Sequence, residues 1–234
     1  MSDLEIKGYK QSSLIEWPGL LVDLIFVAGC DFRCPFCHNP DLIFLDTVKS
    51  YDINEVLDEI HKRANGKWLD GISITGGEPA TNKRLPDFLK IIKDWGLKTK
   101  IDTNGNHPEV IEKLIADKLV DYIAMDIKAI PANYHLAAGR KINMKPIMKS
   151  IEIILSSGID HEFRTTVVPG IIDIEKDFIV MADLIKGAKR YYIQQFRPLR
   201  CFDKEFEKLE PYTLDKLETA CAKINHLFEV CEVR

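Results

Sequence analysis

Short runs rich in apolar and β-branched residues alternate with amphipathic stretches along this chain of 234 residues. The apolar runs predict strands at 21–27, 71–75, 98–102, 122–127, 162–168 and 191–196. The stretches between them predict helices at 54–64, 85–95, 108–118, 146–156, 175–185 and 214–227. Ile111, Leu114 and Ile115 have the i, i+3, i+4 spacing of a helix face that packs on a core. Gly96 and Gly158 stand where helix C-terminal caps are expected.

This alternation predicts an α/β fold with a parallel sheet, because successive βα units join parallel strands by right-handed crossovers. Six units are too few to close an eight-stranded barrel, so we expect a partial (β/α)6 TIM-like barrel of parallel strands with outer helices. A flat, doubly wound sheet is the structural alternative. No linker divides the chain, and we expect one domain over 1–234, with an N-terminal segment (1–19), a barrel core (20–200) and a C-terminal helix and tail (201–234).

Composition and charge narrow the classes of function. Hydrophobic residues make up 46% of the chain and charged residues 29%, as in ordinary globular proteins. The net charge of −4 gives no basic field for nucleic acid. Residues 1–10 contain no signal-peptide core, and no apolar stretch is long enough to span a membrane. We therefore expect a cytoplasmic protein, in which clustered cysteines indicate metal binding or catalysis. Pairing among Cys201, Cys221 and Cys231 is possible by their spacing in the chain, but the reducing compartment argues against it and favours isolated buried thiols.

The remaining cysteines, Cys30, Cys34 and Cys37, lie in one loop directly after the first predicted strand. Soft thiolates select zinc or iron–sulfur clusters. Structural sites of both kinds usually have four protein ligands, and this loop supplies one ligand fewer. An open position on a metal is useful when the metal has to bind a molecule that reacts. The loop therefore predicts a catalytic metal centre.

Polar groups collect where the other predicted strands end. These groups are Gly76-Gly77-Glu78-Pro79, Asp102-Thr103-Asn104-Gly105, Asp126 with Lys128, Arg164-Thr165-Thr166, and Gln194 to Arg197. Ligands of parallel α/β sheets bind outside the carboxyl ends of the strands, so these groups are expected to share one rim. Taken alone, the glycine and asparagine segments also fit ordinary turns, and Asp126 with Lys128 fits an ordinary ion pair. Their convergence with the cysteine loop favours a functional site.

The cysteine spacing, Cys30-X3-Cys34-X2-Cys37 with Phe36 before the last cysteine, resembles the signature of radical S-adenosylmethionine (SAM) enzymes. The Gly76-Gly77-Glu78-Pro79 segment resembles the second motif of that superfamily. The resemblance covers nearly the whole chain. It implies that the three cysteines hold a 4Fe–4S cluster whose remaining iron binds SAM, and that SAM is reductively cleaved to methionine and a 5′-deoxyadenosyl radical.

Within the superfamily, the chain resembles the activating enzymes of glycyl-radical proteins. The segments 13–19 and 37–40 resemble those on either side of their cluster loop, and 121–129 and 162–169 resemble the activating proteins of anaerobic ribonucleoside-triphosphate reductases. The short distance from Cys37 to Gly77 leaves no room for an inserted ferredoxin-like domain. The resemblance implies a glycyl-radical partner, here an anaerobic ribonucleotide reductase, and flavodoxin or ferredoxin as electron donor.

The resemblance also assigns roles to residues on the rim. Those expected to contact the methionyl amino end of SAM are Gly76, Gly77 and Glu78. Those expected at its ribose or carboxylate are Asp102, Asn104, Lys128 and Arg164, with Phe36 at the adenine. His38 has two interpretations, a contact near the cluster or simply a loop residue.

A monovalent cation is a further expectation. Asp102, Thr103 and Asp126 match positions that hold such a cation in the pyruvate formate-lyase activating enzyme. Alternatively, the two carboxylates pair with Lys128.

Two other functions are compatible with the cysteine loop. A radical SAM enzyme that acts on a small molecule, such as one resembling 7-carboxy-7-deazaguanine synthase, would share the cluster and SAM residues. A binding module with a structural zinc ion held by the three cysteines and His38 would share only the loop, since short metal motifs are common.

Overall fold

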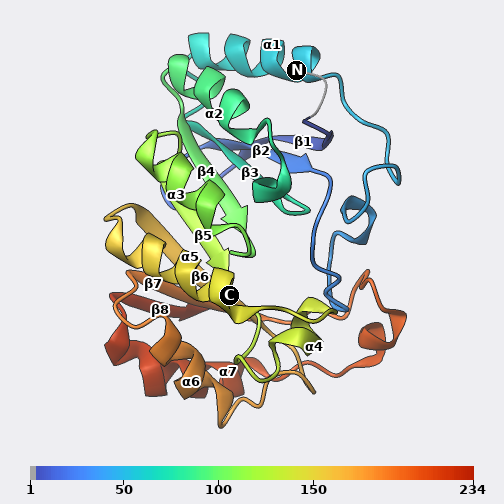
Figure 1. Cartoon of the computed structure of the whole chain (residues 1–234), viewed down its shortest axis with the longest axis vertical. Helices are drawn as coiled ribbons and strands as arrows, with labels where there is room; N and C mark the ends of the chain where they lie inside the picture. Colours follow the sequence, from blue (N-terminus) through green and yellow to red (C-terminus); the bar gives the residue numbers. More distant parts are fainter. Residues whose placement is uncertain (1–3) are drawn as a thin grey trace. The chain divides into compact units, whose positions relative to one another are not determined.

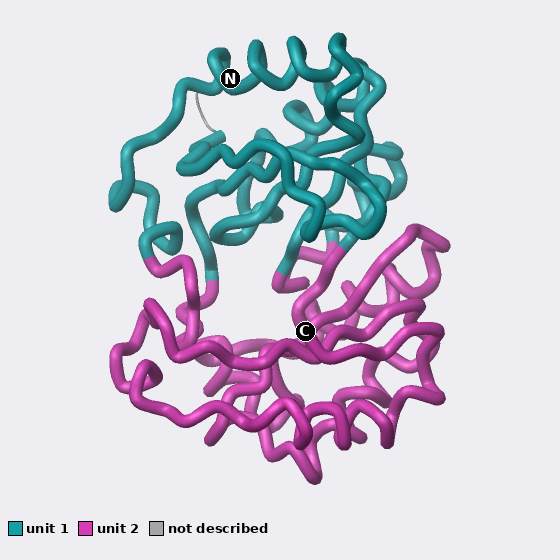
Figure 2. Tube along the Cα trace, turned by 180° about the vertical axis from the view of Figure 1, so that it is seen from behind, with its two compact units in different colours: residues 1–31, 41–103, 109–123 teal, residues 32–40, 104–108, 124–234 magenta. Residues whose placement is uncertain are grey.

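The computed structural model describes residues 4–234 and divides into two compact units (Figure 2). Unit 1 contains the described residues up to 31, with 41–103 and 109–123. Unit 2 contains 32–40, 104–108 and 124–234. Residues 1–3 of the predicted N-terminal segment lie outside the described residues. The cysteine loop contributes Cys30 to unit 1, and Cys34 and Cys37 to unit 2.

Unit 1 is built on the strands β1 (Ile6–Ser13), β2 (Val22–Val27), β3 (Gly71–Gly76) and β4 (Lys98–Thr103). β2, β3 and β4 run parallel, whereas β1 runs antiparallel to β2. The helices of this unit are α1 (Ile53–Asn65), α2 (Leu85–Asp94) and α3 (Pro108–Ala116), with short 3-10 helices at Pro40–Leu42 and Pro79–Thr81 (Figure 1). The first residues of two of them, Pro40 and Pro108, belong to unit 2. Each α-helix buries an apolar face, represented by Ile60, Phe88 and Ile111.

Unit 2 continues the same βα pattern. β5 (Tyr122–Asp126) begins in unit 1 and ends in unit 2, and it is followed by β6 (Asp160–Val167), β7 (Arg190–Gln195) and β8 (Val230–Val233). β6, β7 and β8 run parallel. The helices are α4 (Tyr134–Ala138), α5 (Met144–Ser156), α6 (Asp177–Leu184) and α7 (Leu214–Ile224), with 3-10 helices at Lys204–Lys208 and Asn225–Leu227.

The predicted fold class, α/β with parallel strands and outer helices, is confirmed. The strands are ordered β1 to β8 as in the sequence, and β2 to β7 match the six predicted strands to within two residues. The sheet differs from the prediction in having two further strands, because β1 and β8 were not predicted. β1 is largely polar, β8 has only four residues, and both stand at ends of the strand order, where a buried apolar run is not required.

The C-terminal cysteines differ partly from expectation. Cys201 and Cys221 are buried, but Cys231 is only half-buried. Cys221 on α7 and Cys231 on β8 are free thiols whose Sγ atoms lie 2.7 Å apart, so neither is isolated. Among residues 4–234 there is no helix with the length and apolar character needed to cross a membrane.

Candidate metal and cofactor site

The second and third cysteines lie in one turn of unit 2. The backbone N–H of Cys37 donates to the carbonyl of Cys34 at 3.0 Å. On one side of this turn, Arg33 N–H donates to the carbonyl of Ala138 at the end of α4 (2.8 Å). On the other side, Asp203 N–H donates to the carbonyl of Pro35 (2.9 Å). Backbone hydrogen bonds to two separate segments therefore hold the position of both thiols.

Cys30 follows β2 in unit 1 and is also fixed through its backbone. Its N–H donates to the carbonyl of Ile43 at 3.2 Å, and the N–H of Gly29 donates to the carbonyl of Leu42 at 2.9 Å. The carbonyl of Gly29 accepts the N–H of Glu78 at 2.7 Å, which joins the cysteine loop to the end of β3.

The two glycines of the Gly-Gly-Glu-Pro segment allow the end of β3 to approach β2 closely. Gly76 has a φ of +119°, and a Cβ there would lie 2.4 Å from the carbonyl oxygen of Val27. A Cβ on Gly77 would lie 2.2 Å from the carbonyl oxygen of Gly29. A side chain at either position would therefore push the backbone apart. The close approach of the two strands therefore accounts for glycine at both positions.

Glu78 is buried, at 1% exposure, and its carboxylate is held from two directions. Oε1 accepts the N–H of Ala80 at 3.0 Å and the hydroxyl of Thr103 at 2.8 Å. Thr103 ends β4, so this hydrogen bond ties two neighbouring strand-end motifs of unit 1 together. The sequence did not indicate this bond, because its partners lie 25 positions apart.

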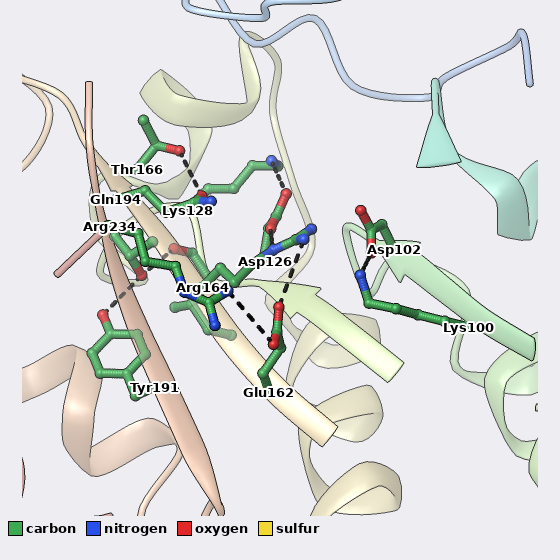
Figure 3. Close-up of polar contacts among 12 residues, drawn as sticks. Lys100, Asp102, Asp126, Lys128, Glu162, Arg164, Thr166, Tyr191, Gln194 and Arg234 are labelled. Carbon is green, nitrogen blue, oxygen red and sulfur yellow. Dashed lines mark hydrogen bonds and ion pairs between the residues drawn. The ribbon is translucent and has the colours of Figure 1, made fainter. Parts of the chain in front are cut away.

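Asp102 is paired with a residue that sequence reasoning missed. The Nζ of Lys100 lies 2.7 Å from Asp102 Oδ1, and the side chain of Lys100 is 1% exposed (Figure 3). Alternate residues of a strand point to the same face, so the Lys-X-Asp spacing was an available signal for this pair. It mirrors the Asp-X-Lys spacing of Asp126 and Lys128.

In unit 2, Asp126 bridges two cations (Figure 3). Its Oδ2 lies 3.2 Å from Lys128 Nζ, and its Oδ1 lies 3.0 Å from Arg164 Nε. The simple ion pair considered from the sequence is therefore present and extended by Arg164. A second carboxylate, Glu162, lies 3.8 Å from Arg164 Nη1 and 3.9 Å from Arg234 Nη1. Three predicted residues, Asp126, Lys128 and Arg164, are thus brought into direct contact.

The charge of Lys128 acts on the cysteine turn. Burial opposes ionisation of Lys128, but the Asp126 carboxylate and Cys34 raise its pKa above the ordinary value, so it is cationic at neutral pH. Burial raises the pKa of Cys34 to about 11, and Lys128 counteracts this rise. Burial also raises the pKa of Cys37. A nearby cation favours thiolates, which are the form that binds metal.

The other predicted residues of unit 2 are fixed by neighbouring segments. Phe36 is buried, at 7% exposure. The Nε2 of His38 lies 2.9 Å from the carbonyl oxygen of Arg197, and its ring stacks on Phe196 at 6.3 Å between centroids. These contacts anchor the cysteine turn to the segment that follows β7, and they are compatible with both interpretations of His38. Asn104 is buried, and its Oδ1 accepts the N–H of Asn106 at 2.9 Å.

The donor set suits an iron–sulfur cluster. Cys30, Cys34 and Cys37 offer soft sulfur ligands, and the positive charge of Lys128 acts on two of them, Cys34 and Cys37. Two of the three thiols are already presented from one turn. Over residues 4–234, no three His, Cys, Asp or Glu side chains are gathered closely enough to hold a single metal ion.

The matching family model and the similar proteins belong to the same family. The family model of the radical SAM superfamily matches residues 24–185. MJ1227 of Methanocaldococcus jannaschii, provisionally named a glycyl-radical enzyme activating enzyme, is 36% identical over 210 residues, which cover 87% of this chain and 85% of that protein. The pyruvate formate-lyase-activating enzyme of Clostridium pasteurianum is 27% identical over 228 residues, which cover 91% of this chain and 90% of that enzyme.

Solved structures share the fold at low sequence identity. SuiB of Streptococcus suis, bound to its precursor peptide SuiA, matches with a TM-score of 0.70 and 16% identity. The match covers 91% of this chain and 49% of SuiB, so the chain spans about half of that protein. A structure of TYW1 with a lysine–pyruvate adduct matches with a TM-score of 0.66 and 18% identity. The match covers 89% of this chain and 75% of the TYW1 chain. At these identities the likeness concerns the fold alone.

Proposed function

This chain belongs to the radical SAM superfamily and, within it, to the glycyl-radical enzyme activating enzymes, and from this premise we propose that it cleaves SAM reductively and generates a glycyl radical on a partner protein. One observation carries the proposal. The region matched by the family model, 24–185, contains every residue predicted to bind the cluster or SAM, from Cys30 to Arg164. We treat the chain 1–234 as one functional radical SAM domain.

The cysteines are the proposed cluster ligands. Cys30, Cys34 and Cys37 would hold a 4Fe–4S cluster, and that cluster would supply the electron for cleavage of SAM. Lys128 favours the thiolate form of Cys34. The backbone bonds of Arg33 and Pro35 keep the turn in place while the ligands bind.

SAM binding is assigned to the strand-end groups. The residues proposed for the methionyl amino end are Gly76, Gly77 and Glu78. Those proposed for the ribose or carboxylate are Asp102, Asn104, Lys128 and Arg164, with Phe36 at the adenine. Asp126 holds the cations of Lys128 and Arg164 together, at 3.2 and 3.0 Å. Fixed groups of this kind orient a bound molecule before it reacts.

The proposed partner is an anaerobic ribonucleoside-triphosphate reductase, with flavodoxin or ferredoxin as electron donor. The segments 121–129 and 162–169 support this partner through their resemblance to its activating proteins. Relatives named pyruvate formate-lyase-activating enzyme make pyruvate formate-lyase the main competing partner.

The test is direct generation of the radical. The full chain, with its cluster reconstituted anaerobically and reduced, is incubated with SAM and either an anaerobic ribonucleotide reductase or pyruvate formate-lyase. We expect a glycyl-radical doublet in the EPR spectrum with the reductase, together with 5′-deoxyadenosine. A reductase variant whose radical glycine is replaced by alanine is the control and should give no doublet.

Each other outcome has a defined meaning. If the doublet forms only with pyruvate formate-lyase, then pyruvate formate-lyase is the partner and the reductase is not. Formation of 5′-deoxyadenosine without any protein radical would favour a small-molecule substrate. Zinc in place of iron and sulfide, with no SAM cleavage, would overturn the enzyme assignment.

A further inference from the structure

Unit 1 contains a buried lysine to which the proposed function gives no role. Lys100 lies on β4 with a side chain that is 1% exposed, and its Nζ lies 2.7 Å from Oδ1 of Asp102 (Figure 3). The ring of Tyr122 has its centroid 6.0 Å from the same Nζ. The Lys100 ammonium is therefore enclosed by protein and directed at the carboxylate proposed to contact SAM.

The surroundings of Lys100 are polar as well as buried. Its register partner on β3 is Ser73. The hydroxyl of Ser73 is fully buried and has no hydrogen-bond partner within the part of the chain that the structure describes. An unsatisfied buried hydroxyl is unfavourable, and a bound water or ligand group would satisfy it. A buried ammonium is likewise tolerated only with a close counter-charge, which here is Asp102.

This arrangement conflicts with the monovalent cation expected from the family resemblance. That cation would be held by Asp102, Thr103 and Asp126. Lys100 already neutralises Asp102. Asp126 contacts both Lys128 and Arg164. An added K⁺ or Na⁺ would therefore have to compete with built-in cations for the same carboxylates, and these residues do not fit it.

We infer that Lys100 is a positioning residue whose ammonium supplies the positive charge at Asp102 that a bound monovalent cation would otherwise supply. The inference rests on the proposed function, in which Asp102 contacts SAM. It follows that SAM binding by this chain is independent of K⁺ and Na⁺. An ammonium fixed by the strand also holds the Asp102 carboxylate in one orientation without an ion having to bind first.

The test measures SAM affinity in different salts. Equilibrium dialysis with the reconstituted full chain is run in KCl, NaCl and tetramethylammonium chloride at equal ionic strength, since tetramethylammonium is too large to replace K⁺ at a carboxylate. For the unaltered chain we expect dissociation constants that agree within about twofold, a difference well below 1.4 kcal/mol. In Lys100→Met the affinity should fall about tenfold or more in tetramethylammonium chloride and recover partly in KCl or NaCl. Lys100→Arg keeps the charge and should remain independent of the salt.

Two controls separate this role from a structural one. Lys93→Met breaks another Lys–Asp pair of unit 1, in which Lys93 lies 2.7 Å from Asp121, and it should leave SAM affinity unchanged in every salt. Lys100→Met with Asp102→Asn removes both charges and leaves no unpaired carboxylate. Comparing the thermal unfolding of the single variant Lys100→Met with that of this double variant shows whether the loss of affinity in the single variant reflects misfolding.

The inference and the proposed function fail in different ways. If K⁺ or Na⁺ strengthens SAM binding by the unaltered chain about tenfold, or if Lys100→Met binds SAM normally in tetramethylammonium chloride, the inference is wrong. If the unaltered chain neither binds nor cleaves SAM in any salt, the proposed function is wrong instead.

Discussion

Cys34→Ala is expected to abolish cluster retention and SAM cleavage while leaving the fold largely intact. Cys34 is the most buried of the three loop thiols, and the charge of Lys128 opposes the rise in its pKa that burial causes. Its loss removes a direct ligand, so the rate of 5′-deoxyadenosine formation should fall by more than the roughly 100-fold seen when an outer-shell partner of a metal is lost. The measurements are iron and sulfide content, visible absorption of the cluster, and chromatography of the nucleoside product.

The fold should survive this change, because the turn is held through backbone groups. The hydrogen bonds of Arg33, Pro35 and Cys37 do not involve the Cys34 thiol. Removing one buried sulfur is expected to cost about 1–2 kcal/mol of unfolding free energy, which circular dichroism during thermal unfolding would detect. Cys221→Ala is the matched control, since it removes another buried thiol far along the sequence. It should keep both cluster and activity.

Complete unfolding of Cys34→Ala would point to a different kind of site. In a structural metal site the binding energy of the metal is folding energy, so loss of a ligand unfolds the protein. A folded Cys34→Ala chain that still retained iron and cleaved SAM would also contradict the assignment.

The central strands could be predicted because they are buried on both faces, and their sequences are therefore continuous apolar runs. β2 to β7 were found for this reason, and the motifs at their ends followed from them. β1 escaped prediction because its IKGYKQSS sequence exposes polar residues at the edge of the sheet. α4 has only five residues, too few for a helical period to be recognised.

The identities of the candidate residues could be predicted, but not their partners. Arg164 and Asp126 are 38 positions apart, and only the neighbouring strands bring Arg164 Nε within 3.0 Å of the carboxylate. The bond from Thr103 to Glu78 was hidden for the same reason. Lys100 was overlooked although its spacing from Asp102 placed both on one face of a strand. Pairing across strands depends on register, which local patterns do not encode.

Gly139 was not singled out from the sequence, and Gly139→Ala is expected to release the cluster. Gly139 caps α4 with a φ of +66°, and a Cβ there would lie 1.8 Å from the carbonyl oxygen of Arg33. Because Arg33 directly precedes Cys34, the backbone of the cysteine turn would have to move. We expect iron content and 5′-deoxyadenosine formation to fall by about 10-fold or more, the range for loss of support around a metal.

The left-handed backbone of Gly139 must be separated from its contact with Arg33. Gly158→Ala provides this comparison, because Gly158 has a φ of +74° after α5 and an added Cβ would meet nothing within 4 Å. Both variants should lose about 1–2 kcal/mol of unfolding free energy from the left-handed backbone alone. Only Gly139→Ala should also lose iron. Equal losses of stability with full cluster content in both variants would mean that the contact between Gly139 and Arg33 does not position the cysteine turn.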